Sequence, residues 1–230
     1  MVLAVVFGVI GVSSSGCGSS GASSGGSQLV ASVDGVSITK ASVEHWMRVE
    51  SVLSYVLTPT VPAPKGVLPD PPSYAACIAW LGSARGPVMA HSLTAAQRKT
   101  ECEQHLVDLR RKTVEFLVLY QWYVGEAKAE GITVPESEVR KNLARYIREE
   151  IPGKFQRYLS ASGMSEADAL FLQRLTAYGE KVKAPILAKP PSEARRALLQ
   201  FTSKWVAKTS CQPGYVFPGC RQYRGSDPPP

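Results

Sequence analysis

The sequence has little of the material from which catalytic and membrane-spanning proteins are built. Histidine occurs only 3 times in 230 residues, and the carboxylates form no dense cluster, which leaves little for a metal enzyme. No apolar run reaches the roughly 18 to 20 residues of a transmembrane helix, so a polytopic membrane protein is excluded. The motifs G-x-S-x-G, H-E-x-x-H and the P-loop are missing as well. We therefore expect no catalytic residue, no metal site and no cofactor.

The composition nevertheless suits a folded chain. Apolar residues make up 44% of the sequence and charged residues 20%, a mixture that can bury a core. The length fits one domain of ordinary size with tails.

Charged side chains are missing from residues 1–33 and unevenly divided after them. Residues 34–180 carry 17 basic and 17 acidic side chains, whereas residues 181–230 carry 9 basic and 2 acidic ones. The whole net charge of +7 therefore lies in the C-terminal part of the chain. No nucleic-acid-binding motif accompanies this surplus, and we expect no nucleic-acid partner. A solvated cationic helix explains the surplus without function, and attraction to an anionic cell surface or to acidic polypeptides is the functional interpretation.

Residues 1–17 resemble a bacterial lipoprotein signal. The segment 1–12 is apolar but too short to span a bilayer, and small residues (SSSG) lead into Cys17. The resemblance implies that Cys17 is lipidated and that the protein is a cell-membrane lipoprotein outside the cytoplasm, in the periplasm or on the outer face of the plasma membrane. An ordinary secretory signal that is cleaved nearby is the alternative. Residues 18–28 contain only Gly, Ser, Ala and Gln, which is typical of a flexible tether.

The number and spacing of the cysteines favour disulfide bonds. With Cys17 assigned to a lipid, four cysteines remain in an exported chain and allow three pairings: Cys77, Cys102, Cys211 and Cys220. We expect the pairing of sequence neighbours, Cys77–Cys102 and Cys211–Cys220. A zinc site that adds nearby histidines to two of these cysteines is the alternative, although only Cys102 and His105 have a spacing that suits ligands on one helix.

Periodicity predicts a mainly α-helical fold with a small N-terminal β-hairpin. Residues 29–39 alternate apolar and polar side chains around Asp34-Gly35, which is a strong signal for a two-residue hairpin. Apolar residues at helical spacing from Thr94 to about Glu130 predict a long central helix that Gly131 ends. Further helices are expected over residues 41–57, 73–82, 133–150, 154–163, 165–182 and 192–209.

Capping boxes and prolines mark the boundaries of these elements. Thr133 with Glu136 and Ser165 with Asp168 form the capping-box pattern at the start of two helices. Six prolines over 58–72 exclude regular structure there, so residues 58–93 form a proline-rich insertion that carries one short helix. Residues 221–230 end in three prolines and are predicted to be a disordered tail.

Large apolar and aromatic side chains supply the adaptable contacts that binding of unfolded polypeptides requires. Five candidates for such contacts are Trp46, Met47, Trp80, Tyr146 and Tyr158. Burial in an ordinary core is the alternative, and it is the better interpretation for the aromatic residues of the long helix. Trp80 differs from the others because its short helix lies inside the proline-rich insertion.

Three segments resemble the N-terminal chaperone module of the SurA/PrsA family of extracytoplasmic foldases. They read VASVDGVSITKASVE, EAKAEGITVPESEV and KFQRYLSASGMSEADALFLQRLTAYGEKV, in that order over residues 29–183. The C-terminal segment FTSKWVAKTSCQPGYVFPGCRQY is similar to the ending of secreted foldases in this family. The resemblance implies that 29–220 is a single module, in which residues 192–220 return as a helix and a strand.

The resemblance also says how the returning part should pack. It implies that Gly214–Phe217 joins the hairpin as a third strand. It further implies that Leu198, Phe201 and Trp205 of the last helix pack against the module.

One departure from the family decides the expected activity. Full-length members commonly carry a parvulin prolyl-isomerase domain between the last N-terminal helix and the returning helix. Here that position corresponds to Lys183–Pro191, which is too short for a domain of about 90 residues. We therefore expect an exported, lipid-anchored, chaperone-like protein that binds unfolded or extended polypeptide clients without isomerase catalysis. The alternatives are a scaffold lipoprotein with one fixed partner and, less well supported, a prolyl isomerase.

The lipid-anchor hypothesis makes a direct prediction. Replacing Cys17 with Ala removes the only thiol that lipidation can use at this signal, so the protein should move from the membrane fraction to the soluble exported fraction. Fractionation followed by intact-mass measurement of both forms checks this. A Cys17→Ala protein that stays in the membrane fraction to the same extent as the parent would rule out the anchor.

Overall fold

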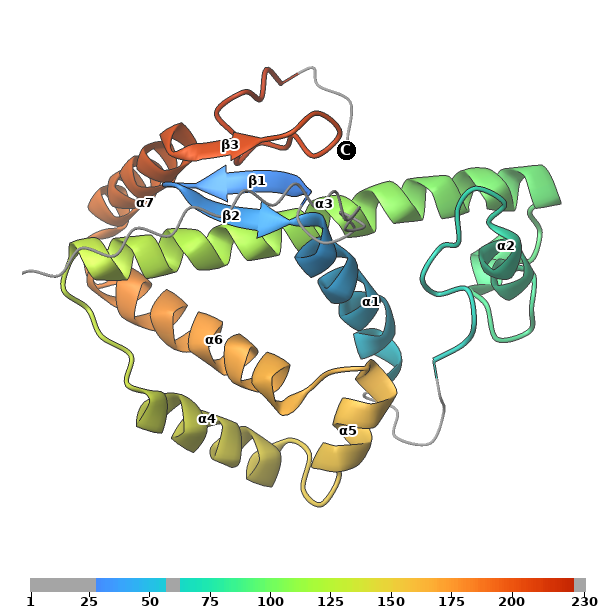
Figure 1. Cartoon of the computed structure of the whole chain (residues 1–230), viewed down its shortest axis with the longest axis horizontal. Helices are drawn as coiled ribbons and strands as arrows, with labels where there is room; N and C mark the ends of the chain where they lie inside the picture. The colour runs from blue at the N-terminus through green and yellow to red at the C-terminus, as the bar shows by residue number, and fades with distance from the viewer. Residues whose placement is uncertain (1–27, 57–62, 226–230) are drawn as a thin grey trace, which may run out of the picture.

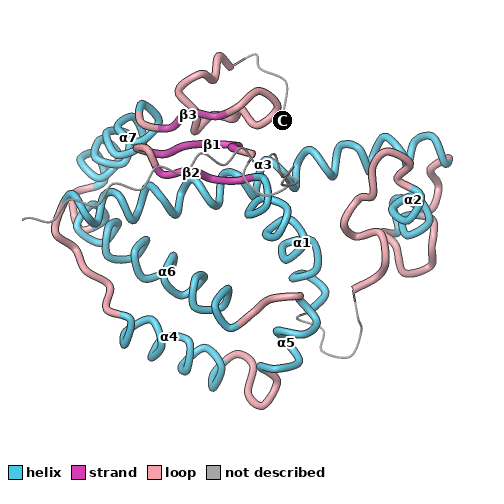
Figure 2. Tube along the Cα trace, viewed as in Figure 1, coloured by secondary structure: helices cyan, strands magenta, loops and turns pink. Residues whose placement is uncertain are grey.

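The computed structural model describes residues 28–56 and 63–225. The predicted signal, Cys17 and nearly all of the predicted tether lie outside the described residues. The described chain is mainly helical with a small antiparallel sheet, which confirms the predicted fold class (Figures 1 and 2). Its elements are β1 (Leu29–Val33), β2 (Val36–Thr39), α1 (Lys40–Val56), α2 (Ala75–Leu81), the short 3₁₀ helix η1 (Val88–Ala90), α3 (Ala95–Ala129), α4 (Glu136–Glu149), α5 (Phe155–Ser162), α6 (Glu166–Leu187), α7 (Pro191–Ala207) and β3 (Thr209–Cys211).

The long helix α3 is the element against which the others are arranged. It begins with a capping box between Thr94 and Gln97, and its middle is buried at Val114, Leu117 and Val118. In Figure 1 it crosses the molecule, with the sheet and α7 above it, α1 and α6 below it, and α2 beside its N-terminal end. A helix that is apolar nearly all round needs neighbours on every side, and the fold supplies them.

The sheet joins the two ends of the described chain. The hairpin turns at Asp34 and Gly35, which both have positive φ (49° and 85°), as a two-residue turn between twisted strands requires. Strand β1 lies between β2 and β3, and the register pairs Ala31 with Cys211 and Val33 with Thr209. The C-terminal segment therefore completes the sheet, as the fold prediction expects.

The predicted position of the third strand is wrong. The strand is Thr209–Cys211, directly after α7, and Gly214–Phe217 forms no ladder with the hairpin. Pro213 and Pro218 border that segment, and Gly214 adopts a positive φ of 82°, so its backbone cannot stay extended. Phe217 is nevertheless buried, because the loop folds back and places its ring in the core.

Helix α7 is fastened to α3 through Trp205, which is only 1% exposed. The ring lies against the backbone of Gly125, where any larger residue would overlap it. Its Nε1 donates a hydrogen bond to Oε2 of the buried Glu126 (2.6 Å), and Nζ of Lys204 pairs with the same oxygen (2.7 Å). A buried carboxylate is tolerated only when it is paired in this way.

A second set of hydrogen bonds continues from this contact into the sheet. Trp122 Nε1 donates to Oγ1 of Thr209 (2.8 Å), and that hydroxyl donates to the carbonyl of Trp205 (2.8 Å). Lys208 and Asp34 then form an ion pair at 3.0 Å between the end of α7 and the hairpin turn. Helix α3, helix α7 and the sheet thus share one polar network, all of whose buried members are satisfied.

Other details of the last helices differ from the predictions. Leu198 is 36% exposed and does not pack into the core as expected, because the first turns of α7 extend away from it. Phe201 is half-buried and stacks on Tyr123 with ring centres 5.9 Å apart. Helix α6 continues past 182 to Leu187 and accommodates Pro185 in its last turn.

One of the two predicted capping boxes is wrong. Ser165 and Asp168 cap α6 reciprocally, as predicted. Thr133 does not cap α4, because that helix begins later, with Pro135 at the N-cap position and no side-chain cap. Proline fixes φ at a value that suits the start of a helix. The carboxylates of Glu136 and Glu138 lie in the first turn, where they interact favourably with the positive end of the helix dipole.

Both predicted disulfides are present. Cys77–Cys102 has a Cα–Cα distance of 6.1 Å and fastens α2 to α3, and Cys211–Cys220 has one of 5.8 Å and closes the loop after β3. The zinc alternative is wrong, because its cysteines are used in the first bridge. Cys77 and Cys102 are fully buried with Leu81 and Ala90, so the described part of the insertion has a small core of its own. We call residues 63–93 the disulfide lobe.

The contact between Trp205 and Gly125 predicts that Gly125→Ala lowers stability, whereas helix propensity alone predicts that it raises stability. At an ordinary helix position, Gly125→Ala should stabilise by up to about 1 kcal/mol because alanine is the better helix former. Here the added methyl group overlaps the Trp205 ring, so we expect a loss of about 1 to 3 kcal/mol in chemical denaturation.

Gly179→Ala in α6 is the matched control. Its nearest new contact is the edge of the Tyr123 ring at 3.1 Å, so it should cost clearly less. Stabilisation by Gly125→Ala would contradict the packing described for Trp205.

Candidate functional site

Three hollows lie in a row along α1, α3 and α6. The first, of about 230 Å³, is bounded by the disulfide lobe, α1 and α3; it is lined by Glu50, Ser51, Leu53, Val67, Trp80, His105, Asp108, Leu109 and Lys112. The second, of about 160 Å³, lies between α1, α3 and α6; it is lined by Trp46, Glu50, Leu53, Lys112, Thr113, Phe116 and Leu172. The third, of about 170 Å³, lies between α4, α5 and α6; it is lined by Leu143, Tyr146, Phe155, Tyr158, Met164, Ala169, Leu172 and Gln173.

Shared side chains join the hollows to one another. Glu50, Leu53 and Lys112 line both the first and the second hollow, and Leu172 lines both the second and the third. The row therefore runs from the disulfide lobe to the α4–α5 end of the molecule. We call it the client groove.

An aromatic cluster forms the floor of the groove at its centre. Trp46 contacts Phe116 and Phe171, with ring centres 5.2 and 5.0 Å apart, and Phe171 also contacts Tyr120 at 4.4 Å. Rings that interlock in this way are held in place, so the second hollow is largely formed before any ligand enters. Trp46 is 8% exposed, and only part of its surface faces the hollow.

A tyrosine pair lines the third hollow. Tyr146 of α4 and Tyr158 of α5 meet edge to face with ring centres 6.4 Å apart. Burial, together with the neighbouring Tyr146, raises the pKa of Tyr158 to about 12. Tyr158 therefore offers an apolar ring and a neutral hydroxyl at neutral pH.

Four of the five residues predicted for client binding line the groove, which brings together Trp46, Trp80, Tyr146 and Tyr158. Met47 lies in the main core, is 7% exposed and lines none of the three hollows. Sequence reasoning missed Leu53, Phe116 and Leu172. Their only signal was apolar spacing on a helix, which does not tell a core position from a groove wall.

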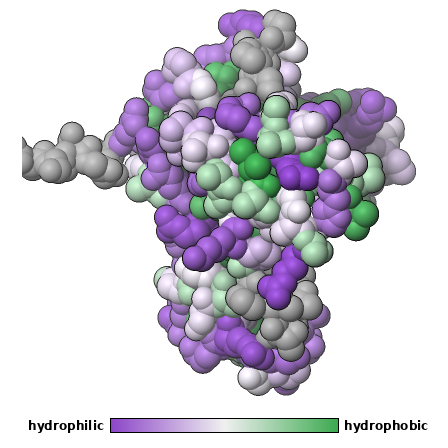
Figure 3. All heavy atoms as spheres, turned by 90° about the vertical axis from the view of Figure 1, so that its right-hand side faces the viewer, coloured by the Kyte–Doolittle hydropathy of each residue, from purple (hydrophilic) through white to green (hydrophobic). Residues whose placement is uncertain are grey.

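The disulfide lobe adds exposed apolar surface beyond the groove. Val88 and Met89 in η1 are 82% and 88% exposed. Figure 3 shows apolar surface in the middle of the face that the lobe presents, surrounded by polar side chains. The Cys77–Cys102 bridge fastens the lobe that carries these exposed residues to α3.

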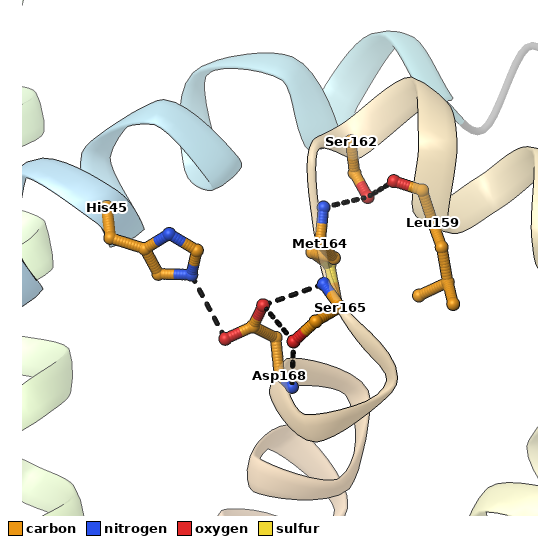
Figure 4. Close-up of polar contacts among 6 residues, drawn as sticks. All are labelled: His45, Leu159, Ser162, Met164, Ser165 and Asp168. Carbon is orange, nitrogen blue, oxygen red and sulfur yellow. Dashed lines mark hydrogen bonds and ion pairs between the residues drawn. The ribbon is translucent and has the colours of Figure 1, made fainter.

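A carboxylate-centred junction holds α1 against the start of α6 (Figure 4). His45 Nε2 lies 3.0 Å from Oδ1 of Asp168, and the backbone N–H and hydroxyl of Ser165 donate to Oδ2 at 2.8 and 2.7 Å. Serine, histidine and aspartate also form the catalytic triads of hydrolases, but they are hydrogen-bonded in a different sequence here. The serine hydroxyl donates to the aspartate and has no contact with the histidine, so no base is placed to activate it.

The role of this junction is structural. It joins the helix that carries Trp46 to the helix that carries Leu172, and so sets the separation of two walls of the groove. Burial acts to raise the pKa of Asp168, but the hydrogen bonds from Ser165 and His45 outweigh it and hold that pKa below its ordinary value.

The described residues show neither of two further kinds of site. Within residues 28–56 and 63–225, no three His, Cys, Asp or Glu side chains are grouped so that they could hold a metal ion. None of the helices described there has the length and apolar character that crossing a bilayer requires.

Comparisons with known proteins give no further guide. No family model, curated protein or solved structure matches this chain. The resemblance to the SurA/PrsA module therefore rests on its sequence motifs, and any function must be argued from the groove.

The junction predicts how stability depends on pH. Asp168→Asn keeps the shape of the side chain but removes the charge and replaces one acceptor oxygen with an NH2 donor, so the variant should be less stable by about 1 kcal/mol near pH 7. A carboxylate whose pKa is lowered by folding contributes stability above its unfolded pKa, and that contribution is lost as the pH falls through the folded value.

The difference between parent and variant should therefore shrink below about pH 4. Urea denaturation at several pH values measures it. A difference that stays constant from neutral to strongly acidic pH would contradict the charge-based account. Glu149→Gln, which changes an exposed pair with its sequence neighbour Arg148, serves as the control and should have little effect at any pH.

Proposed function

We propose that this protein is an extracytoplasmic, lipid-anchored, chaperone-like protein that binds unfolded or extended polypeptide segments in the client groove. One observation carries the proposal: three small hollows that share wall residues combine aromatic and aliphatic side chains with polar ones, from five helices and the disulfide lobe. The sequence resemblance to an extracytoplasmic chaperone module points the same way.

The size of the hollows favours a polypeptide over a small metabolite. Each hollow measures about 160 to 230 Å³, whereas sites for small molecules usually measure roughly 300 to 1,000 Å³. A row of small hollows instead suits a chain whose apolar side chains enter one after another. In an extended chain, alternate side chains point the same way and lie about 7 Å apart, so neighbouring hollows can be filled by one segment.

The chemistry of the walls favours broad specificity. Apolar contact dominates the second hollow, where Glu50 and Lys112 lie at the border with the first hollow. The polar side chains gather at the first hollow and its border, and only the second and third hollows are lined mainly by apolar side chains. A groove of this kind selects apolar content and extended conformation more than a particular sequence.

A scaffold protein with one fixed partner is the second candidate. The exposed Val88 and Met89 favour it, because a small exposed apolar patch is also what a single partner recognises. A peptide array separates the two functions. Binding to many aromatic-rich and aliphatic-rich peptides supports the chaperone, and binding to one peptide alone supports the scaffold. Acceleration of proline cis/trans exchange in proportion to protein concentration would instead support the isomerase.

The groove predicts the effect of a single substitution. Leu172 lines two hollows, so Leu172→Ser should weaken binding of an apolar peptide by about tenfold, because an apolar contact worth ~1.5 kcal/mol is lost. Suppression of aggregation of an unfolded protein should fall in parallel. Fluorescence titration and light scattering measure the two effects.

Leu199→Ser is the matched control. Leu199 is 60% exposed on α7 and lines none of these hollows, so its loss should leave peptide binding unchanged. Leu53→Ser, at the border of the first and second hollows, guards against a folding defect at Leu172, and thermal melting identifies one. Parental binding by both groove variants, with their folds intact, would overturn the proposal.

A further inference from the structure

The junction between α6 and α7 forms a projecting cationic elbow, which we define as residues 183–200. Most of its residues are exposed, and in the first ten residues of α7 only Ala194 and Ala197 are half-buried. This contrasts with the end of the same helix, where Trp205 is 1% exposed. The elbow therefore offers a surface that the rest of the described chain does not cover.

The elbow combines exposed leucines with basic side chains. Leu187 is 61%, Leu198 36% and Leu199 60% exposed, and they account for three of the seven large apolar residues that are exposed in the described chain. The basic residues of the elbow are Lys183, Lys189, Arg195 and Arg196, against the single acidic residue Glu193.

The two arginines are not used by the fold. Among the described residues, no hydrogen bond or ion pair involves the guanidinium of Arg195 or Arg196, whereas Arg140 and Arg174 are paired with carboxylates. Arg196 and Lys189 border an open depression of about 350 Å³ that Ser192, Glu193, Ala197 and Gln200 also line. Two cations beside an open hollow can approach an anionic group from solvent without breaking an existing contact.

We infer that the elbow is a peripheral membrane-contact surface that binds bilayers containing anionic phospholipids. Leucines beside arginines are the composition of surfaces that lie in the bilayer interface, where the apolar side chains enter the headgroup region and the cations pair with phosphates. At the depression, Arg196 and Lys189 are the cations that can reach a phosphate headgroup, and Glu193 is the one carboxylate in its lining. An acidic protein is the alternative partner. It could pair with the arginines, but such pairing would not explain why leucines that are up to 61% exposed lie beside them.

This contact is independent of client binding and of the anchor. A basic patch is one of the signals that strengthen the attachment of a protein to a membrane. The inference can therefore be tested without a lipid, and its failure would leave the proposed function of the client groove untouched.

The test uses the full chain carrying Cys17→Ser, so that no lipid is attached. Co-sedimentation is measured with vesicles of phosphatidylcholine alone and with vesicles that contain equal parts of phosphatidylcholine and phosphatidylglycerol. We expect binding to the anionic vesicles that weakens as salt is raised. Replacing both Arg195 and Arg196 with Gln should weaken it by about thirtyfold, since each basic residue near an anionic bilayer contributes roughly fivefold.

Two further variants separate a specific surface from net charge. Arg145→Gln with Arg148→Gln on α4 removes the same charge from exposed positions elsewhere, and should leave binding close to that of the parent. Leu198→Ser with Leu199→Ser keeps the charge and should weaken binding at every salt concentration. Soluble inositol hexaphosphate, added as competitor, tests whether a phosphate group alone is enough; failure to displace the protein would show that the bilayer is required.

Three results would overturn the inference. They are equal binding to both kinds of vesicle, equal loss of binding in the α4 and α7 arginine variants, and no binding to either vesicle. In the last case an acidic polypeptide becomes the partner to seek. The side chains substituted on α4 and α7 are all exposed, and circular dichroism with thermal melting confirms that the variants fold.

Discussion

The rest of the fold depends on the seating of Trp205 against the backbone of Gly125. The absence of a side chain at Gly125 lets the indole approach α3, and the buried Glu126 receives both its N–H and the Lys204 ammonium. Because the indole is fixed, Thr209 falls within reach of Trp122, and β3 begins in register with β1. The three-stranded sheet, which is made from both ends of the described chain, thus depends on the packing of the Trp205 indole in the space beside Gly125. A hairpin of two strands alone would be only marginally stable in water.

The same arrangement gives the molecule two ends with different surfaces. Helix α3 spans 35 residues, which is about 52 Å, and it carries the disulfide lobe near its N-terminal end and Trp205 near its C-terminal end. Figure 1 shows α2 and α7 at opposite ends of this helix. The client groove begins at the lobe, and the cationic elbow lies on the α7 side. In the proposed arrangement, a membrane contact at one end leaves the groove at the other end open to clients.

The groove is built from contacts that also stabilise the fold. The Trp46–Phe116–Phe171 cluster belongs to the core, yet it forms the floor of the second hollow, and the His45–Asp168 pair fixes the helices on either side. Hence the groove has a rigid floor, while half-buried aliphatic side chains such as Leu53 and Leu172 form its borders. This division suits a surface that accepts varied apolar segments. A fixed floor limits the entropy that is lost when a ligand binds.

The sequence by itself determined the features that depend on local chemistry. The Asp34-Gly35 hairpin, the long helix, the Ser165 capping box and both disulfides follow from turn preference, apolar period, capping and the pairing of neighbouring cysteines, and the structure confirms them. The tertiary structure alone decided where distant elements meet. It placed the third strand at Thr209–Cys211, left Leu198 exposed and joined Leu53 to Leu172 through one groove. The position of the third strand depends on the fit of Trp205 into the space at Gly125, because Thr209 bonds to the carbonyl of Trp205. Periodicity along one helix carries no information about the shape of another.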